Sequence, residues 1–398
     1  MEEWKLTKIG SICKKVCSGG TPKSTVKEYY GGGIPWLNTK EVHFNRIYST
    51  ESTITYNGLN NSAAKWIEAN AVIIAMYGAT AAKCAIGMIP MTTNQACCNL
   101  MIDEKKADYR FVYYGIANSY SILASLANGG AQQNLNAQVI KDFEILLPSL
   151  VIQKRIADVL STLDDKIECN RRINDNLLKQ ARALYKSWFV DFEPFKNGEF
   201  KDSELGMIPH GWSVKQLGEI TTQVNEKVRE RVDVKVLSPI TTGELVLSEE
   251  YFTKQVFSES ISKYIVVKPS DFAYNPARVN IGSLGMNEYG FDGCVSPVYV
   301  VFRCEDDYQY FFDLFRRTET FKEEVKARAI GGVRQSLTYK DFSLIKVVYP
   351  PIDVIHRFNQ VYSRVLAKTK HNKVETTRLA SLRDTLLPKL ISGELKIS

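Results

Sequence analysis

The sequence is poor in the residues that build metal centres and disulfide frameworks. Its 398 residues include four scattered histidines and eight cysteines. Cys13 and Cys17 form a single C-x3-C pair, Cys97 and Cys98 are adjacent, and no second pair follows at ligand spacing. We therefore expect no metal site, and free thiols in a reducing compartment.

A long uninterrupted apolar run is also absent. The most apolar window, Ala71 to Met91, contains Lys83, Pro90 and two glycines, whereas a bilayer span needs about 20 nearly uninterrupted apolar residues. The first five residues, MEEWK, show no charged-then-apolar signal pattern. We expect a cytoplasmic protein with no membrane partner.

Motifs for nucleotide and methyl-group chemistry are incomplete. Gly31-Gly32-Gly33 is followed by Ile34-Pro35, without the Gly-Lys-Ser/Thr of a phosphate-binding loop. An amino-methyltransferase would need an Asn-Pro-Pro-aromatic turn to hold a flipped base. Asn275-Pro276-Ala277-Arg278 lacks the second proline and the aromatic residue, so we interpret it as a turn between strands.

Length and charge set broad limits. A chain of 398 residues suggests two or three domains. The formal net charge is +7 and the pI is near 8.8. This modest excess of positive charge suits a protein that contacts phosphates, but many proteins that bind no nucleic acid share it.

The strongest signal is an internal repeat of about 200 residues. Residues 4–12 (WKLTKIGSI) recur as residues 212–220 (WSVKQLGEI). Residues 129–135 (GGAQQNL) and 143–148 (FEILLP) align with 331–337 (GGVRQSL) and 345–350 (IKVVYP), both at an offset of 202. Because the segments between these anchors diverge, we infer one duplicated fold with two specificities.

A helical pattern follows each half of the repeat. Apolar residues recur at steps of three and four, and no glycine or proline interrupts Val151 to Val190. This predicts a helix of about 38 residues, roughly 57 Å long. The length favours two helices packed as a coiled coil over ordinary core helices. The second stripe is Phe358, Val361, Val365, Leu379, Leu382 and Leu386.

These patterns predict an α+β fold with duplicated globular α/β domains and two long antiparallel coiled-coil helices, related by a pseudo-two-fold axis. The first domain covers residues 1–150 and its helix 151–190. A linker covers 191–205. The second domain covers 206–350, and its helix with the C-terminal tail covers 351–398.

A polar residue interrupts the stripe of each helix. Asn170 and Asn372 are 202 residues apart, and each occupies a position where an apolar residue is expected. Around a two-fold axis the two amides would meet near the helix midpoints and hydrogen-bond across the seam. A buried asparagine of this kind sets the register of a helix pair.

Three segments carry a resemblance to a known family. They are residues 184–195 (LYKSWFVDFEPF), 203–212 (SELGMIPHGW) and 382–395 (LRDTLLPKLISGEL). Together they resemble the specificity subunits of type I restriction-modification systems, over essentially the whole chain. Gly20-Thr21-Pro22 and Ile34-Pro35-Trp36 also resemble the opening of the recognition domains of that family.

The resemblance implies a DNA-recognition subunit without catalytic activity or a cofactor of its own. Each target-recognition domain would read one half of a bipartite, asymmetric site in double-stranded DNA. The helices would bind modification subunits that carry S-adenosylmethionine, and a restriction subunit would supply the ATP- and Mg-dependent translocase and nuclease. A self-sufficient DNA methyltransferase and a DNA-independent scaffold are the alternatives.

Candidates for DNA contact come from residue type and from proximity to glycine or proline turns. Arg, Lys, Asn, Gln, Ser and Thr side chains can read base edges or hold phosphates. Loops beside such turns can reach a groove, and Arg278, Arg334 and Gln335 flank the duplicated landmarks. The candidates are Lys23, Ser24, Asn38, Thr39, Lys40, Gln132, Gln133 and Asn134 in the first domain, and Lys227, Arg229, Arg231, Arg278, Asn280, Arg334 and Gln335 in the second.

Overall fold

The computed structural model describes residues 4–128, 135–252, 257–258, 260–329 and 336–397. The chain forms two compact units. The first contains residues 1–171 and 373–398, and the second contains residues 172–372. Each unit therefore combines one globular domain with part of both long helices.

Two sheets form the globular part of the first unit. The larger sheet has the strand order β2-β10-β7-β8-β4 and the smaller one β5-β3-β9-β6. The strands are β2 (Cys13–Ser18), β3 (Tyr30–Leu37), β4 (Asn45–Ile47), β5 (Ser52–Ile54), β6 (Trp66–Ile67), β7 (Ala71–Ala75), β8 (Cys84–Gly87), β9 (Met91–Thr93) and β10 (Cys97–Ile102).

Among its described residues the second unit repeats this topology without a counterpart of β4. Its sheets have the orders β15-β22-β19-β20 and β17-β16-β21-β18. In the sheets β5-β3-β9-β6 and β17-β16-β21-β18 one strand pair is parallel, β3 with β9 and β16 with β21. The duplicated fold is thus confirmed far beyond the three sequence anchors. The strands are β15 (Thr221–Val224), β16 (Lys235–Pro239), β17 (Leu245–Leu247), β18 (Ile265–Val267), β19 (Phe272–Tyr274), β20 (Leu284–Met286), β21 (Gly293–Val295) and β22 (Val300–Cys304).

The central strand of the first unit explains why its apolar window is continuous. All five residues of β7 are buried. Val72 and Ile74 pack into one apolar cluster, and Ile73 and Ala75 pack into another. Because successive side chains of a strand point to opposite faces, a strand covered on both faces needs apolar residues at every position. Among the described residues, no helix is long and apolar enough to cross a membrane.

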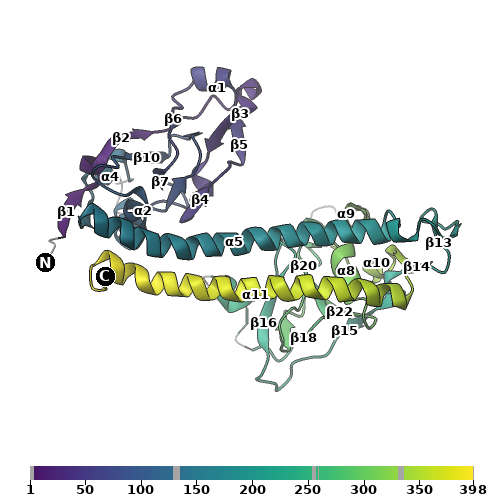
Figure 1. Ribbon diagram of the computed structural model, residues 1–398. Helices are drawn as coiled ribbons and strands as arrows, with labels where there is room; N and C mark the ends of the chain where they lie inside the picture. Colours follow the sequence, from purple (N-terminus) through teal and green to yellow (C-terminus); the bar gives the residue numbers. More distant parts are fainter. Residues whose placement is uncertain (1–3, 129–134, 253–256, 259, 330–335, 398) are drawn as a thin grey trace. The chain divides into compact units, whose positions relative to one another are not determined.

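Two helices of 40 residues follow the domains, α5 (Leu150–Phe189) and α11 (Ile352–Ile391) (Figure 1). Their first residues are 202 apart, as are those of the preceding strands, β11 (Glu144–Leu147) and β23 (Lys346–Tyr349). β11 pairs with β1 (Lys5–Lys8), and β23 pairs with β14 (Ser213–Gln216). The long helices predicted from the periodic pattern are confirmed.

Both helices contribute to the core of each unit. In the first unit, Ile156 and Leu160 of α5 share an apolar cluster with Leu390 of α11 and with the domain. In the second unit, Tyr185 and Phe189 of α5 pack with residues of α11 that include Phe358 and Tyr362. The helices are therefore part of each domain's core as well as a connection between domains.

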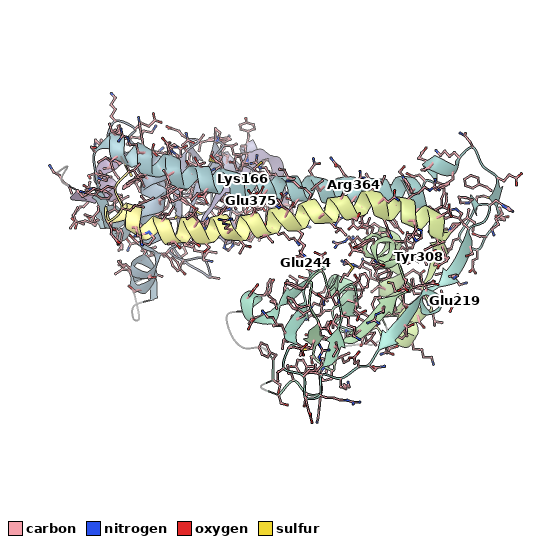
Figure 2. The ribbon with its side chains drawn as sticks, turned by 60° about the horizontal axis from the view of Figure 1, so that its bottom comes forward. Lys166, Glu219, Glu244, Tyr308, Arg364 and Glu375 are labelled. Atoms are coloured by element: carbon pink, nitrogen blue, oxygen red, sulfur yellow. The ribbon has the colours of Figure 1, made fainter. Side chains whose placement is uncertain are left out.

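The helices run antiparallel within each unit. In the first unit, Asp164 pairs with Arg383 at 2.7 Å, and six residues further along α5 Asn170 donates to Glu375 at 2.8 Å. Figure 2 shows Lys166 beside Glu375, and the Nζ of Lys166 lies 3.4 Å from the Glu375 carboxylate.

In the second unit the residue numbers also run in opposite directions. Asn174 donates to the Thr369 carbonyl at 3.3 Å, and the rings of Tyr185 and Phe358 lie 6.5 Å apart. The antiparallel orientation predicted from the repeat is confirmed.

The two seam asparagines each have a partner within their own unit. Both are fully buried. Asn170 donates to Glu375, and Asn372 donates to Asn174 at 2.8 Å. The side-chain oxygens of Asn170 and Asn372 accept no hydrogen bond among the described residues. Direct pairing of the two amides would join the two units and stays a prediction.

A buried ion pair lies in the second unit where α8 (Gln309–Phe315) meets α11. Arg316 donates to Asp313 at 2.9 Å, and Tyr362 of α11 donates to the other carboxylate oxygen at 2.9 Å. Burial alone would raise the pKa of Asp313, but the charges of Arg316 and Arg317 and the Tyr362 hydroxyl outweigh it and lower it to about 2.

We predict that Asp313→Asn destabilises the second unit by about 3–5 kcal/mol, because it leaves the buried Arg316 without a counter-charge. The pKa of Asp313 in the folded state lies below its value in the unfolded chain. Its ionised carboxylate therefore adds to the free energy of unfolding above about pH 4, and this contribution declines as the pH falls toward about 2. Calorimetric unfolding at neutral pH measures the loss. The exposed Asp306→Asn is the control, and equal stability of the two variants would contradict the prediction.

Candidate nucleic-acid interface

Equivalent loops follow β7 in the first unit and β19 in the second. In the first unit residues 76–83 connect β7 to β8, and in the second residues 275–283 connect β19 to β20. The sequences of the two loops, MYGATAAK and NPARVNIGS, have little in common. The same scaffold therefore presents two chemically different loops.

Local hydrogen bonds shape the loop of the second unit. The Asn275 side chain accepts from the backbone N–H of Ala277 at 3.0 Å, and the N–H of Ser283 donates to the Arg278 carbonyl at 3.1 Å. Gly282 has a φ of 99° and ends the short 3-10 helix η5 (Val279–Ile281). The turn predicted for residues 275–278 is confirmed.

This loop separates two pockets, and two of the sequence candidates line different ones. Arg278 lines a pocket of about 340 Å³, together with Asn275 and Ser283. Asn280 lines the other pocket, of about 380 Å³. Thr241, in the turn after β16, contributes to both. A short stretch of backbone therefore presents polar groups to two surfaces.

Arg278 lies among aromatic side chains. Tyr251, Phe252, Tyr264 and Tyr299 line the same pocket. Burial raises the pKa of Tyr299, and the charge of Arg278 opposes that shift. Arginine next to an amide and aromatic rings provides donors for a base edge and flat faces for stacking. Among the described candidates, Arg278 has the surroundings best suited to contact a base.

The other described basic candidates of the second unit lie between β15 and β16, and none of them lines either pocket. Lys227 forms an isolated β-bridge with Ile265. Arg231 pairs with Asp233 at 2.8 Å and with Asp292 at 3.0 Å, so its guanidinium already has two carboxylate partners. Arg229 is exposed and has a φ of 54°.

In the first unit, Asn38 and Thr39 have structural roles. Asn38 begins the 3-10 helix η3 (Thr39–Glu41), forms a capping box with Glu41 and accepts from Asn94 at 3.2 Å. The Thr39 carbonyl accepts from the Thr80 hydroxyl at 2.8 Å. This contact attaches η3 to the loop after β7 and brings two of the predicted residues to that loop.

The remaining described candidates of the first unit are exposed. Lys40 forms an ion pair with Glu51 at 2.5 Å. Lys23 and Ser24 lie in a turn closed by the Val26 N–H, which donates to the Lys23 carbonyl at 3.0 Å. Gln132, Gln133, Asn134, Arg334 and Gln335 lie outside the described residues, and their predicted DNA contacts stay predictions.

Sequence analysis missed several residues at these loops. Tyr77, which is 40% exposed, donates to the Gln95 carbonyl at 3.4 Å in the first unit. The position of Tyr77 between an apolar strand and Gly78 could have identified it as a loop residue. In the second unit Arg182, Arg317 and Lys326 line the larger pocket. They come from α5, from the turn after α8 and from α9 (Glu319–Arg328), and spacing along the chain could not predict that they meet.

The described residues provide neither a cluster of metal ligands nor, at Cys97 and Cys98, an activated thiol. No group of three or more His, Cys, Asp or Glu side chains there is arranged to hold a metal ion. Burial raises the pKa of the Cys97 and Cys98 thiols to about 12. These two thiols are therefore poor nucleophiles at neutral pH.

Comparisons with known proteins agree on one family. Residues 1–179 match the model described as the type I restriction modification DNA specificity domain. The MjaIX specificity subunit of Methanocaldococcus jannaschii is 28% identical over 100% of this chain and 94% of its own length. The HindI specificity subunit of Haemophilus influenzae is 22% identical over 69% of this chain and 74% of its own length.

A solved structure shares the fold. The type I restriction-modification S subunit from M. genitalium aligns with a TM-score of 0.59 at 17% sequence identity. The alignment covers 100% of this chain and 97% of that one.

We predict that Gly282→Ala strains the loop between β19 and β20. A Cβ at this position would lie 2.6 Å from the Thr241 carbonyl oxygen, and the φ of 99° disfavours any L side chain. The expected loss is about 1–3 kcal/mol, measured by thermal unfolding. Gly290→Ala is the matched control because its Cβ would meet nothing within 4 Å. Wild-type stability of Gly282→Ala would show that the loop does not need this conformation.

Proposed function

We propose that the chain is a specificity subunit of a type I restriction-modification system and that it selects the DNA site on which such a complex acts. Each unit reads one half of a bipartite, asymmetric sequence in double-stranded DNA. The chain carries out no chemistry itself. S-adenosylmethionine, ATP and Mg belong to partner subunits, and the assembly acts in the cytoplasm.

The observation that carries this proposal is the repetition of one scaffold with different loops. Apart from β4, which has no counterpart among the described residues of the second unit, the order and direction of the strands are the same in the two units. The loops after β7 and β19 differ in length and in aromatic content, and the single basic residue is a lysine in one and an arginine in the other. A conserved framework with two different loops suits two independent recognition events, because base contacts come from loop side chains while the framework only positions them.

The helices support a second part of the proposal, the docking of modification subunits. Val151, Val159, Val374 and Leu382 are exposed apolar residues on the helices of the first unit, and Val361 is one in the second. Exposed aliphatic side chains on a helix pair are typical of surfaces that partner helices cover. We propose that modification subunits bind there and that a restriction subunit joins the assembly.

Two alternatives make different predictions. A self-sufficient methyltransferase would transfer labelled methyl groups from S-adenosylmethionine to DNA when the purified chain is tested alone. A DNA-independent scaffold would assemble with the modification subunit but leave the complex without sequence preference. The proposed specificity subunit transfers no methyl group alone and confers sequence preference on the complex.

We also propose that the polar positions in the helix seam set the spacing between the half-sites. The bonds from Asn170 to Glu375 and from Asn372 to Asn174 each need one particular register. A sliding helix pair would break both bonds and leave buried amides without partners.

Exchange of residues 1–150 with the equivalent domain of a related subunit tests the proposed function. We expect one half of the target to change while the other half and the spacer are preserved, because the second unit retains its own loops and core. Methylome mapping of cells that carry the hybrid and its modification subunit gives the result. A hybrid with two altered half-sites would refute independent recognition.

We predict that Arg278→Ala weakens recognition of the second half-site alone. A lost bidentate contact to a guanine edge costs about 1–3 kcal/mol and relaxes preference at one base pair. Competition binding with half-site variants measures the effect. Arg231→Ala is the control, because the guanidinium of Arg231 is paired with Asp233 and Asp292. Loss of the same size at both half-sites would argue against a base contact.

A further inference from the structure

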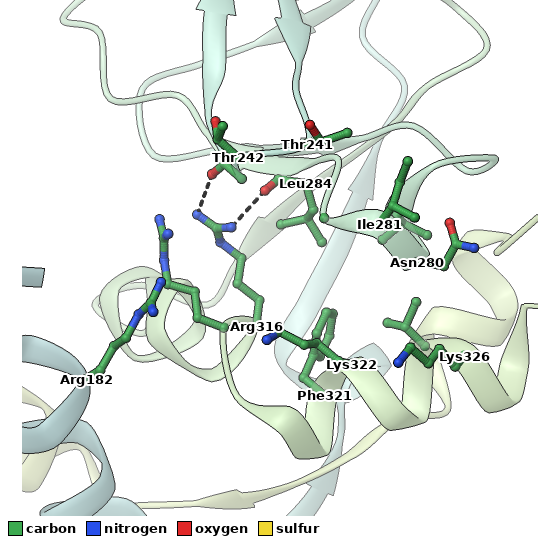
Figure 3. Close-up of a pocket in the computed structure, with 15 residues that line it drawn as sticks. Arg182, Thr241, Thr242, Asn280, Ile281, Leu284, Arg316, Phe321, Lys322 and Lys326 are labelled. Carbon is green, nitrogen blue, oxygen red and sulfur yellow. Dashed lines mark hydrogen bonds between the residues drawn. The ribbon is translucent and has the colours of Figure 1, made fainter. Parts of the chain in front are cut away.

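The second unit has a pocket whose charge is one-sided. It measures about 380 Å³, and its lining includes five basic residues and no Asp or Glu. Figure 3 shows Arg182 from α5 and Lys322 and Lys326 from α9 (Glu319–Arg328) around the same space. Lys322 and Lys326 are four residues apart and therefore project from the same face of α9. The other two basic residues are Arg316 and Arg317.

Arg316 builds the wall of the pocket. Its buried guanidinium donates to the carbonyls of Leu284 at 2.8 Å and Gly243 at 3.0 Å. It also pairs with Asp313, and Arg317 lies 3.4 Å from the same carboxylate. Arg316 and Arg317 therefore share the Asp313 carboxylate, Glu288 adds a negative charge that acts on Arg317, and no Asp or Glu lies in the lining itself.

The side chains opposite add further positive charge. Arg182 and Lys326 are exposed, and neither forms an ion pair with a described residue. Lys322 has a partial counter-charge in Glu319 at 2.6 Å. Thr241 and Thr242 add hydroxyl groups, while the buried Phe321 and Val325 form an apolar part of the lining. Basic donors around a partly apolar cavity suit a phosphate-bearing ligand.

The first unit lacks the positive charge that Arg182 provides to the second unit. Arg182 is the residue of α5 that corresponds to Asp384 of α11, 202 residues later in a helix of the same length. In the first unit Asp384 pairs with Arg383 at 2.8 Å. The corresponding helix position thus carries the opposite charge, so packing of the repeat does not require arginine there.

We propose that this pocket binds a phosphate group and thereby joins the second recognition domain to α5. The ligand is either a backbone phosphate of the bound DNA or the polyphosphate of a free nucleotide. The DNA source rests on the proposed function, and the nucleotide source does not. In either case Arg182 contributes from the helix, and Lys326 contributes from the domain.

The test uses the full chain with Arg182→Gln and Lys326→Gln, singly and combined. Both positions are exposed, so the fold should be preserved, and thermal unfolding checks this. Arg364→Gln is the matched control, because Arg364 is an exposed arginine of α11 that does not line the pocket (Figure 2). Calorimetry measures tripolyphosphate binding. Salt titrations with a duplex carrying the methylome-mapped site measure DNA binding by the complex with the modification subunit.

If the ligand is a DNA phosphate, the plot of the logarithm of the DNA association constant against the logarithm of the salt concentration becomes shallower, its slope changing by about one for each substitution. In that case tripolyphosphate does not bind. If it is a free nucleotide, the wild-type chain binds tripolyphosphate, the double variant binds about tenfold more weakly, and the DNA slope is unchanged. Unchanged values in both assays, or an equal effect of Arg364→Gln, would overturn the proposal. A complex without sequence preference would refute the proposed function, while the tripolyphosphate assay would still test the pocket.

Discussion

Each globular domain completes its apolar core with side chains from both long helices, and the other features of the chain depend on this constraint. In the first unit Ile156 and Leu160 come from α5, and Leu390 comes from α11. In the second, Phe189 of α5 meets Phe358 of α11 with ring centroids 4.9 Å apart. A domain built in this way cannot rotate about a flexible linker, because rotation would expose apolar surface at a cost of about 25 cal/mol per Å². The orientation of each recognition loop is therefore tied to the helices.

That constraint explains which parts of the structure could be predicted from the sequence. A helix of 40 residues repeats its apolar positions many times, so its period is evident without knowledge of its partners. The buried strand β7 is similarly evident as a continuous apolar segment. By contrast, β6 consists of Trp66–Ile67, and two residues carry no period. The equivalence of the sheets β5-β3-β9-β6 and β17-β16-β21-β18 is visible only in their strand order.

The candidate interface was less predictable, because its chemistry depends on partners distant in the chain. Arg231 and Arg278 are both arginines near turns, and the sequence treats them alike. In the structure Arg231 is held by Asp233 and Asp292, whereas Arg278 lines a pocket with aromatic residues. Asn38 likewise has a residue type suited to base contact, but it caps a short helix. Residue type selects candidates, and only the three-dimensional neighbourhood shows which side chains already have partners.

The loop between β19 and β20 connects two kinds of recognition that are usually considered separately. Arg278 faces the aromatic pocket and Asn280 the basic one, with only Val279 between them, and Val279 is buried. A ligand that displaces one side of this loop must therefore move the other, because the buried residue between them limits independent motion. Backbone phosphates position a protein on DNA, and base edges provide specificity. In this loop, a phosphate held by the basic pocket would help to fix the position from which Arg278 tests a base.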